Sequence, residues 1–249
     1  MRGLAALGIA VIAAAAAAGA AAAATGAAEK PSGLMVHVPL DGSVTDATRL
    51  CAVRPEAAGR PDFVRGADGE GAVPAAGQSR VGRLHVSRLA RLVLRGRTPS
   101  TGTIMLWVRL PAAPAGGDSA RTIWVLTSDP PLDLRVGLAG SSPGAPPRLV
   151  AAFDDPSGAT HAIEAPLPAA DGWTHVALGW DAGAGTAIAF VQGESAARAS
   201  GAPFRMPGLP KLFDLGAPGI AIDDFRLYSH LLAGEDLHTL PGLAAAGAR

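Results

Sequence analysis

Residues Gly172–Asp181 read GWTHVALGWD, and after a short AGAGT segment the chain continues with a second apolar run, AIAFVQG. Successive side chains of a β-strand point to opposite faces of the sheet, so this stretch divides into two sets. The set on the face predicted to be core is Thr174, Val176, Leu178 and Trp180. The opposite set is Trp173, His175 and Ala177. The alternation predicts a strand and favours structural roles for both tryptophans and the histidine, with exposure of Trp173 for sugar stacking as the alternative.

Similar short runs rich in Val, Leu, Ile and Trp recur along the chain, separated by Gly, Pro, Asp and Ser. We predict strands over residues 34–40, 83–86, 91–95, 103–110, 121–127, 132–138, 148–153, 160–164, 173–180, 187–192 and 220–228. Only the N-terminal leader and residues 232–240 could be helical. Many strands at short spacing, without helices between them, predict an all-β fold, an antiparallel sandwich or barrel.

The N-terminal segment differs in composition from the rest of the chain. Arg2 precedes an uncharged, alanine-rich run from Gly3 to Ala28. A basic start, an apolar middle and small residues at the end are typical of a secretory signal peptide. An uncleaved membrane anchor is the alternative, because the run is long enough to span a bilayer. We predict a secreted, periplasmic or cell-envelope protein with a signal peptide (1–28), one sandwich domain (29–240) and a flexible tail (241–249).

The charges of the chain balance, but they are unevenly distributed. With 21 basic and 21 acidic residues, the formal net charge is zero, so no global field would attract nucleic acid or a membrane surface. Between Gly71 and Gly117 there is no Asp or Glu, although arginine recurs there. The single cysteine, Cys51, cannot form an internal disulfide. A mature domain of this length must therefore be stabilised by its core.

The arginine-rich window predicts a basic stripe on one sheet face. The residues expected to point outward, with the leucines and Val86 between them pointing inward, are Arg83, His85, Arg91, Arg95 and Arg97. Guanidinium groups suit sulfate, phosphate and carboxylate, so the stripe predicts binding of an acidic glycan or cell-surface polymer. A solvated face without a ligand is the alternative. No aromatic residues are interleaved for base stacking, which argues against nucleic acid.

Four segments, taken in order, carry a family resemblance. They are GLMVHVPLDGSVTDAT (33–48), GTIMLWVRLP (102–111), DGWTHVALGWDAGAGTAIAFVQG (171–193) and AIDDFRLYSHLLAGEDL (221–237). Together they resemble laminin-G-like (LamG) domains of the concanavalin A-like lectin/glucanase superfamily, especially secreted bacterial domains close to pentraxins. The resemblance covers residues 33–240 and implies a two-sheet jelly-roll sandwich. One departure is Gln192-Gly193, where the family usually has the stronger turn signal Asp-Gly or Asn-Gly.

The resemblance also implies one structural calcium ion. Such an ion is held by hard oxygen ligands from loop carboxylates and backbone carbonyls. The matching positions are Asp41, Asp46, Asp223 and Asp224, which would converge if the two ends of the domain pair in one sheet. The alternative is that Asp41 and Asp46 are turn and cap residues, roles that aspartate favours on its own account.

Catalytic patterns are missing from the sequence. Glycoside hydrolysis needs two carboxylates flanking one bond, and no Glu-x-Asp-x-x-Glu run occurs. Adjacent pairs such as Asp223-Asp224 are expected to point to opposite faces of a strand. No G-x-S-x-G elbow occurs either. We therefore predict a non-enzymatic module that binds a carbohydrate or a cell-surface protein, with an adhesive protein lacking a small ligand, or a divergent glycosidase or lyase, as alternatives.

Overall fold

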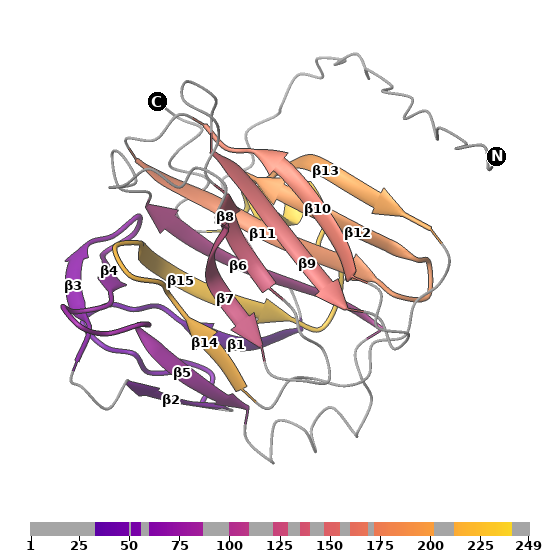
Figure 1. The fold of residues 1–249 in the computed structure, drawn as a ribbon. Coiled ribbons are helices and arrows are strands. Elements are labelled where there is room, and N and C mark those ends of the chain that lie inside the picture. Colours follow the sequence, from indigo (N-terminus) through magenta and orange to yellow (C-terminus); the bar gives the residue numbers. More distant parts are fainter. Residues whose placement is uncertain are drawn as a thin grey trace, which may run out of the picture.

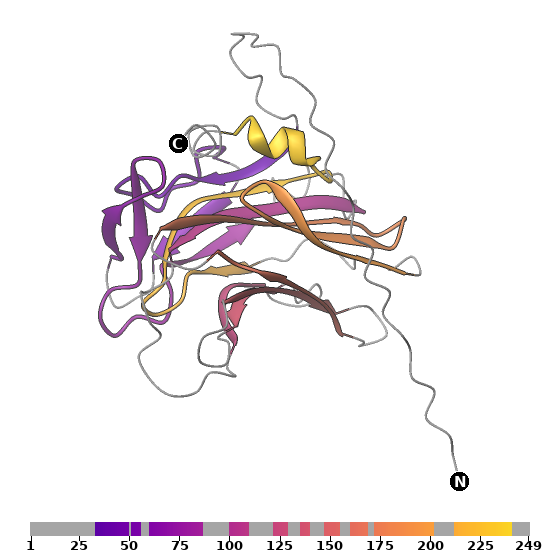
Figure 2. The same cartoon turned by 90° about the horizontal axis from the view of Figure 1, so that it is seen from above.

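The computed structural model consists of two antiparallel β-sheets packed face to face (Figures 1 and 2). It describes residues 33–49, 51–55, 60–86, 100–109, 122–128, 135–139, 147–154, 160–168, 172–201 and 212–240. The predicted signal peptide and tail, and the strand expected over 91–95, lie outside these residues. Within the described ranges, no helix is long and apolar enough to cross a membrane.

Sheet A has eight strands. They are β1 (Leu34–Val38), β3 (Asp62–Arg65), β4 (Glu70–Val73), β6 (Thr101–Arg109), β11 (Trp173–Asp181), β12 (Thr186–Val191), β13 (Glu194–Ser200) and β15 (Ala221–Tyr228). Their spatial order is β13-β12-β11-β6-β15-β4-β3, and β1 also pairs with β15. The first and last strands of the described domain therefore lie side by side, as the resemblance implied.

Sheet B has seven strands. They are β2 (Cys51–Pro55), β5 (Gly82–Val86), β7 (Thr122–Ser128), β8 (Arg135–Ala139), β9 (Arg148–Asp154), β10 (Thr160–Pro166) and β14 (Leu212–Leu215). Their order is β10-β9-β8-β7-β14-β5-β2. The predicted all-β, two-sheet antiparallel sandwich is thus confirmed, and every strand predicted within the described residues is present.

The main core fills the space between the two sheets. In β11 the predicted inward side chains Val176, Leu178 and Trp180 belong to this core, together with Ile104 and Leu106 of the neighbouring strand β6. Gly102 lies directly opposite Trp180 in the β6–β11 register. The Trp180 ring occupies the space where a side chain at position 102 would begin, so only glycine fits there.

A second apolar cluster covers the outer face of sheet A. The short helix α2 (Gly234–His238), within the range predicted to be helical, lies over this face (Figure 2). Buried under it are Met105, Trp107, Phe190 and Tyr228, with Leu237 of the helix itself. Trp107 and its neighbours are therefore core, and this face does not present an exposed aromatic platform.

The hairpin between β12 and β13 turns at Gln192-Gly193, the position where the family pattern is broken. Both residues have positive φ angles, 54° and 82°, as a tight primed turn requires. The Gln192 side chain compensates for the missing Asn or Asp because its Oε1 accepts a hydrogen bond from the backbone N–H of His175. The two-residue turn therefore forms despite the weaker sequence signal.

The two sides of the sandwich are closed differently. On one side, β10 of sheet B lies against β12 and β13 of sheet A. On the other side, the edge strands are β2 of sheet B and β3 of sheet A. The residues between β1 and β2, which include the Leu-Asp-Gly turn, line a pocket with residues of both edge strands. The candidate site lies at this second side.

Candidate functional site

Asp46, one of the predicted calcium ligands, organises the loop after β1. Its Oδ1 accepts hydrogen bonds from the backbone N–H groups of His37 and Thr48, both at 3.0 Å. Its Oδ2 accepts from the N–H of Cys51 at 2.8 Å and from the Thr48 hydroxyl at 2.7 Å. These contacts tie the end of the loop to β1 and to the start of β2, which is the structural role left open as the alternative.

Asp41 fixes the other end of the same loop. Its Oδ1 accepts a hydrogen bond of 2.8 Å from the N–H of Glu70, the first residue of β4. Leu40 and Gly42, on either side of Asp41, both have positive φ angles, 65° and 63°, so the chain turns sharply here. Asp41 and Asp46 therefore hold the intervening residues 42–45 in place from both ends.

Asp223 and Asp224 lie at a β-bulge in β15. The pairing with β6 shifts by one residue between Asp223 and Arg226, and Ile222 and Phe225 both point into the main core. Because two residues then separate successive core positions, both carboxylates lie on the outer side of sheet A. The prediction that these adjacent carboxylates point to opposite faces is wrong for this reason.

Asp224 is ion-paired with Arg226 and hydrogen-bonded to His37. Its Oδ1 lies 2.7 Å from His37 Nε2, and its Oδ2 lies 2.7 Å from an Arg226 guanidinium nitrogen. Burial acts to raise the pKa of this carboxyl, but the hydrogen bond to His37 and the charge of Arg226 outweigh it and lower the pKa. Asp224 thus anchors β1 to β15.

Asp223 is fully buried, and only one of its two carboxylate oxygens has hydrogen-bond partners. Its Oδ2 accepts hydrogen bonds from the N–H groups of Ala67 and Asp68, which holds the β3–β4 turn against sheet A. Its Oδ1 has no partner. Burial raises the pKa of Asp223 to about 7, with a smaller contribution from the charge of Asp224. This carboxyl therefore retains its proton into the neutral range.

The four predicted calcium ligands consequently do not form one ligand set. They serve separate contacts, and no group of three or more His, Cys, Asp or Glu residues suited to a metal ion occurs in the described part of the chain. The described residues do not fit a calcium ion shared by Asp41, Asp46, Asp223 and Asp224. Calcium binding itself stays a prediction.

The predicted basic stripe is only partly described. Leu84 is buried as expected, and Arg83 and the half-buried His85 lie on β5. The Arg83 charge is compensated, because its Nε donates to Asp214 Oδ1 at 2.6 Å and its other nitrogen donates to Oδ2 at 2.9 Å. Arg91, Arg95 and Arg97 lie outside the described residues, so binding by the stripe stays a prediction.

The residues of the GWTHVALGWD strand have structural partners. Trp173 donates its indole N–H to the carbonyl of Arg65 at 3.1 Å, and Arg109 lies 5.2 Å from its ring centroid. His175 is 2% exposed and contacts the Trp107 ring edge-on, at 5.3 Å between centroids. Burial lowers the pKa of His175 to about 3 and outweighs the negative charge of Asp224, which acts to raise it. These contacts agree with the structural roles predicted from alternation.

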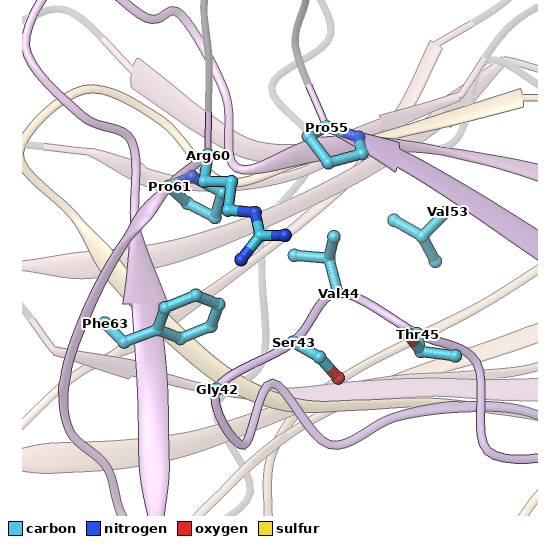
Figure 3. Close-up of a pocket in the computed structure, with 9 residues that line it drawn as sticks. All are labelled: Gly42, Ser43, Val44, Thr45, Val53, Pro55, Arg60, Pro61 and Phe63. Carbon is cyan, nitrogen blue, oxygen red and sulfur yellow. The ribbon is translucent and has the colours of Figure 1, made fainter.

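A pocket of about 300 Å³ opens between the two edge strands (Figure 3). We call it the edge pocket. Its lining residues are Gly42, Ser43, Val44, Thr45, Val53, Pro55, Arg60, Pro61 and Phe63. One wall is the loop that Asp41 and Asp46 hold, and the others come from β2, from β3 and from the residues directly before β3. The carboxylates predicted to bind metal therefore shape the pocket without entering it.

The edge pocket combines three kinds of group. Arg60 extends its guanidinium into the space beside Ser43, Val44 and Phe63 (Figure 3). Hydroxyls are supplied by Ser43 and Thr45, which also line the pocket. Val44, Val53 and Phe63 are half-buried and pack against the main core, so they form a fixed apolar wall. Such an arrangement can bind a small amphipathic group that carries negative charge.

Comparison with protein families identifies the fold. A sequence model of the laminin G type 3 family, in the concanavalin A-like lectin/glucanases superfamily, matches residues 89–238, which is more than half of the chain. The chain belongs to this family. No curated protein sequence matches it significantly. The residues that line the edge pocket precede the part matched by the laminin G type 3 family.

Solved structures with the same fold include botulinum neurotoxin binding domains. The serotype D binding domain has a TM-score of 0.62 and 11% identity, and the match covers 87% of this chain and 51% of that one. A type C structure, titled as showing that cell entry depends on two ganglioside molecules, has a TM-score of 0.58 and 10% identity over 82% and 50%. The DC binding domain in complex with rat synaptotagmin II has the same values. This laminin G type 3 chain spans about half the length of each.

Sequence reasoning did not identify the edge pocket. The two strands that frame it, CAVRP and DFVR, are four or five residues long and were not predicted. The Leu-Asp-Gly turn was noted, but as a source of metal ligands rather than as one wall of a site. Arg60 stands next to a proline and near acidic residues, so nothing in the sequence separated it from other surface arginines.

Proposed function

We propose that the protein is an exported, non-catalytic binding module that holds a carbohydrate or a protein partner at the edge pocket. The observation that carries this proposal is the composition of the pocket: a cation, two hydroxyls and a rigid apolar wall in one concave site. Carbohydrate sites need such a mixture, because a sugar ring has apolar C–H faces and a rim of hydroxyl groups.

The pocket chemistry supports binding rather than catalysis. The nine described residues that line the pocket include no Asp, Glu, His or Cys, so none of these nine can serve as a general acid, a general base or a thiol nucleophile at neutral pH. Hydrolysis of a glycosidic bond needs two carboxyl groups within about 10 Å of each other beside the bond. The buried pair Asp223-Asp224 holds the fold together and does not line the pocket.

Proteins with the same fold support the choice of partner. One botulinum neurotoxin structure is described by the interaction with two ganglioside molecules, and another contains rat synaptotagmin II. These partners are those of the whole toxin domains, of which the match covers about half. At their low identity to this chain, these structures support a class of function and not a ligand.

The experiment compares the native protein with a variant whose pocket is filled. Ser43 is exposed and lines the pocket, so Ser43→Trp should block it without altering the core. Ser195→Trp is the matched control, because Ser195 is exposed on β13, at the opposite edge of sheet A. Each protein is applied to an array of glycans, and the hits are measured by surface plasmon resonance.

We expect the native protein and Ser195→Trp to bind the same glycans, and Ser43→Trp to lose at least about tenfold in affinity. Equal binding by all three proteins would place the site elsewhere. If the native protein binds no glycan and captures no defined protein partner, a purely adhesive role would replace this proposal.

A further inference from the structure

We propose that the edge pocket selects sugars that carry an anionic group, a carboxylate or a sulfate, and that Arg60 determines this selectivity. This inference rests on the proposed function, because it names the ligand class of the same site. It concerns residues 42–63, which the family match at 89–238 does not include.

The guanidinium of Arg60 has no carboxylate partner among the described residues, as is also true of the exposed Arg54, Arg65 and Arg198, but Arg60 differs from them in lining the edge pocket. Arg226 pairs with Asp224, Arg148 with Glu164, and Arg80 and Arg83 share the carboxylate of Asp214. Arg60 is exposed, and no carboxylate among the described residues pairs with it. Among the described residues that line the pocket, it is the only charged one. A cation at a concave site, without a carboxylate partner in the described part of the chain, favours an anionic ligand.

The guanidinium group matches the geometry of an anionic sugar substituent. Arginine can donate two parallel hydrogen bonds to the oxygens of a carboxylate or sulfate group. Figure 3 shows the Arg60 guanidinium directed into the space beside Ser43 and Phe63. An anionic substituent held there would leave the sugar ring in reach of the pocket hydroxyls and of the apolar wall.

The hydroxyls and the aromatic ring favour a sugar as the carrier of that charge. Within the described residues, the hydroxyls of Ser43 and Thr45 have no hydrogen-bond partner, so both are free to bond to a ligand. Phe63 is half-buried against the core, and its remaining surface can stack on the C–H face of a ring. An inorganic anion could accept hydrogen bonds from Arg60 and the hydroxyls, but it would leave the Phe63 ring without a partner.

The size of the pocket argues for a sugar rather than an acidic peptide. A volume of about 300 Å³ is at the lower end for ligand sites. It suits one or two sugar rings. Extended peptides are usually bound along a sheet edge or in a long groove, through repeated backbone hydrogen bonds. The concave feature here is compact, so we treat an acidic peptide as an alternative outcome of the test.

The test measures affinity by titration calorimetry for four probes: oligogalacturonate, dextran sulfate, neutral dextran oligosaccharides and oligoglutamate. The proteins are native, Arg60→Gln, Arg60→Lys and the control Arg198→Gln, whose arginine is exposed on β13 at the far edge of sheet A. Because Arg60 is exposed, all four proteins should have the same melting temperature, which is measured first.

We expect the native protein to bind oligogalacturonate or dextran sulfate more tightly than neutral dextran or oligoglutamate. Arg60→Gln should lose about 10- to 100-fold for the anionic sugar, as expected for removal of a charge-assisted hydrogen bond. Arg60→Lys should recover part of this loss, because lysine keeps the positive charge but cannot donate two parallel hydrogen bonds as a guanidinium does. Arg198→Gln should bind like the native protein.

Three results would overturn the inference. If the native protein binds neutral dextran tightly and Arg60→Gln does not change this affinity, the proposed function stands. Arg60 would then have no part in selectivity, and the ligand would not need an anionic group. Oligoglutamate binding as tightly as the anionic sugars would replace the sugar by an acidic peptide. Failure of every probe, in a native protein that also binds nothing on the glycan array, would remove the proposed function as well.

Discussion

Two buried titratable groups on the outer side of sheet A should make opposite contributions to stability as pH changes. Asp223 is fully buried with an unpaired Oδ1, and burial raises its pKa from 3.8 to about 7. His175 is buried with an unpaired Nδ1, and burial lowers its pKa from 6.5 to about 3. In each case the folded state prefers the neutral form, so folding takes up a proton at Asp223 and releases one at His175.

The signs follow from proton linkage. Between pH 3.8 and about 7, the folded state holds a proton on Asp223 that the unfolded state has lost, so the free energy of unfolding falls as pH rises. Between pH 3 and 6.5, the unfolded state holds a proton on His175 that the folded state lacks, so the free energy of unfolding rises. Each slope is about 1.4 kcal/mol per pH unit. From about pH 4 to 6.5 the two contributions should nearly cancel.

Asp223→Asn should reveal the contribution of His175 to the pH dependence of stability. Asparagine keeps an oxygen that can accept from the N–H of Ala67 but cannot ionise. Between about pH 4 and 6.5 the stability of this variant should therefore rise by about 3 kcal/mol more than that of the native protein. His175→Leu should show the reverse slope over the same range. The assay is urea unfolding, followed by tryptophan fluorescence, at half-unit pH steps.

The slope difference separates titration from packing. A loss of packing contacts lowers the free energy of unfolding of a variant by the same amount at every pH. Removal of a titrating group instead changes the slope of the free energy of unfolding against pH. Titrating groups that do not interact with Asp223 are shared with the native protein and cancel in the difference. If Asp223→Asn and the native protein have parallel stability curves from pH 4 to 7, Asp223 does not take up a proton on folding and this reasoning is wrong.

Three further results are expected. Asp214→Asn should cost about 1–3 kcal/mol at pH 7 by urea unfolding, because it removes hydrogen bonds from Arg83 and Arg80. Burial acts to raise the pKa of Asp214, but the two arginines outweigh it and lower the pKa. The native protein should therefore be more stable than Asp214→Asn above pH 3.8, and this difference should disappear as the pH falls through the lowered pKa of Asp214. Gly102→Val should destabilise by at least about 1–3 kcal/mol because the Trp180 ring fills its site, whereas Gly172→Val, with open space around it, should cost less than about 1 kcal/mol. If the calcium prediction holds, calcium in excess over chelator should raise the melting temperature by several degrees, and an unchanged melting temperature would remove calcium from the account.

The sequence predicted the central strands well because their burial is strong and regular. In GWTHVALGWD the alternation of core and opposite-face residues matches the two clusters on either side of sheet A. The strands that were missed, the edge strands β2, β3 and β13 and the interior strands β4 and β14, are mostly short or weakly patterned. Strand β13 reads ESAARAS, and β3 and β4 have four residues each, so neither β-propensity nor alternation distinguishes them from loops.

The candidate site was less predictable because it depends on tertiary contacts. The bulge that brings Asp223 and Asp224 to one side of β15 leaves no local signal in the sequence. The function of Asp46 depends on N–H groups of residues 37, 48 and 51, which come together only after folding. The edge pocket requires two sheets to end beside each other, so its lining could not be assembled from spacing alone.

Hydrogen exchange, measured by mass spectrometry with and without saturating anionic oligosaccharide, tests the edge pocket most directly. We expect slower exchange in residues 42–45 and 53–63, and no change in β13 at the far edge of sheet A. Slower exchange confined to other strands, with residues 42–45 unaffected, would contradict the assignment of the binding site.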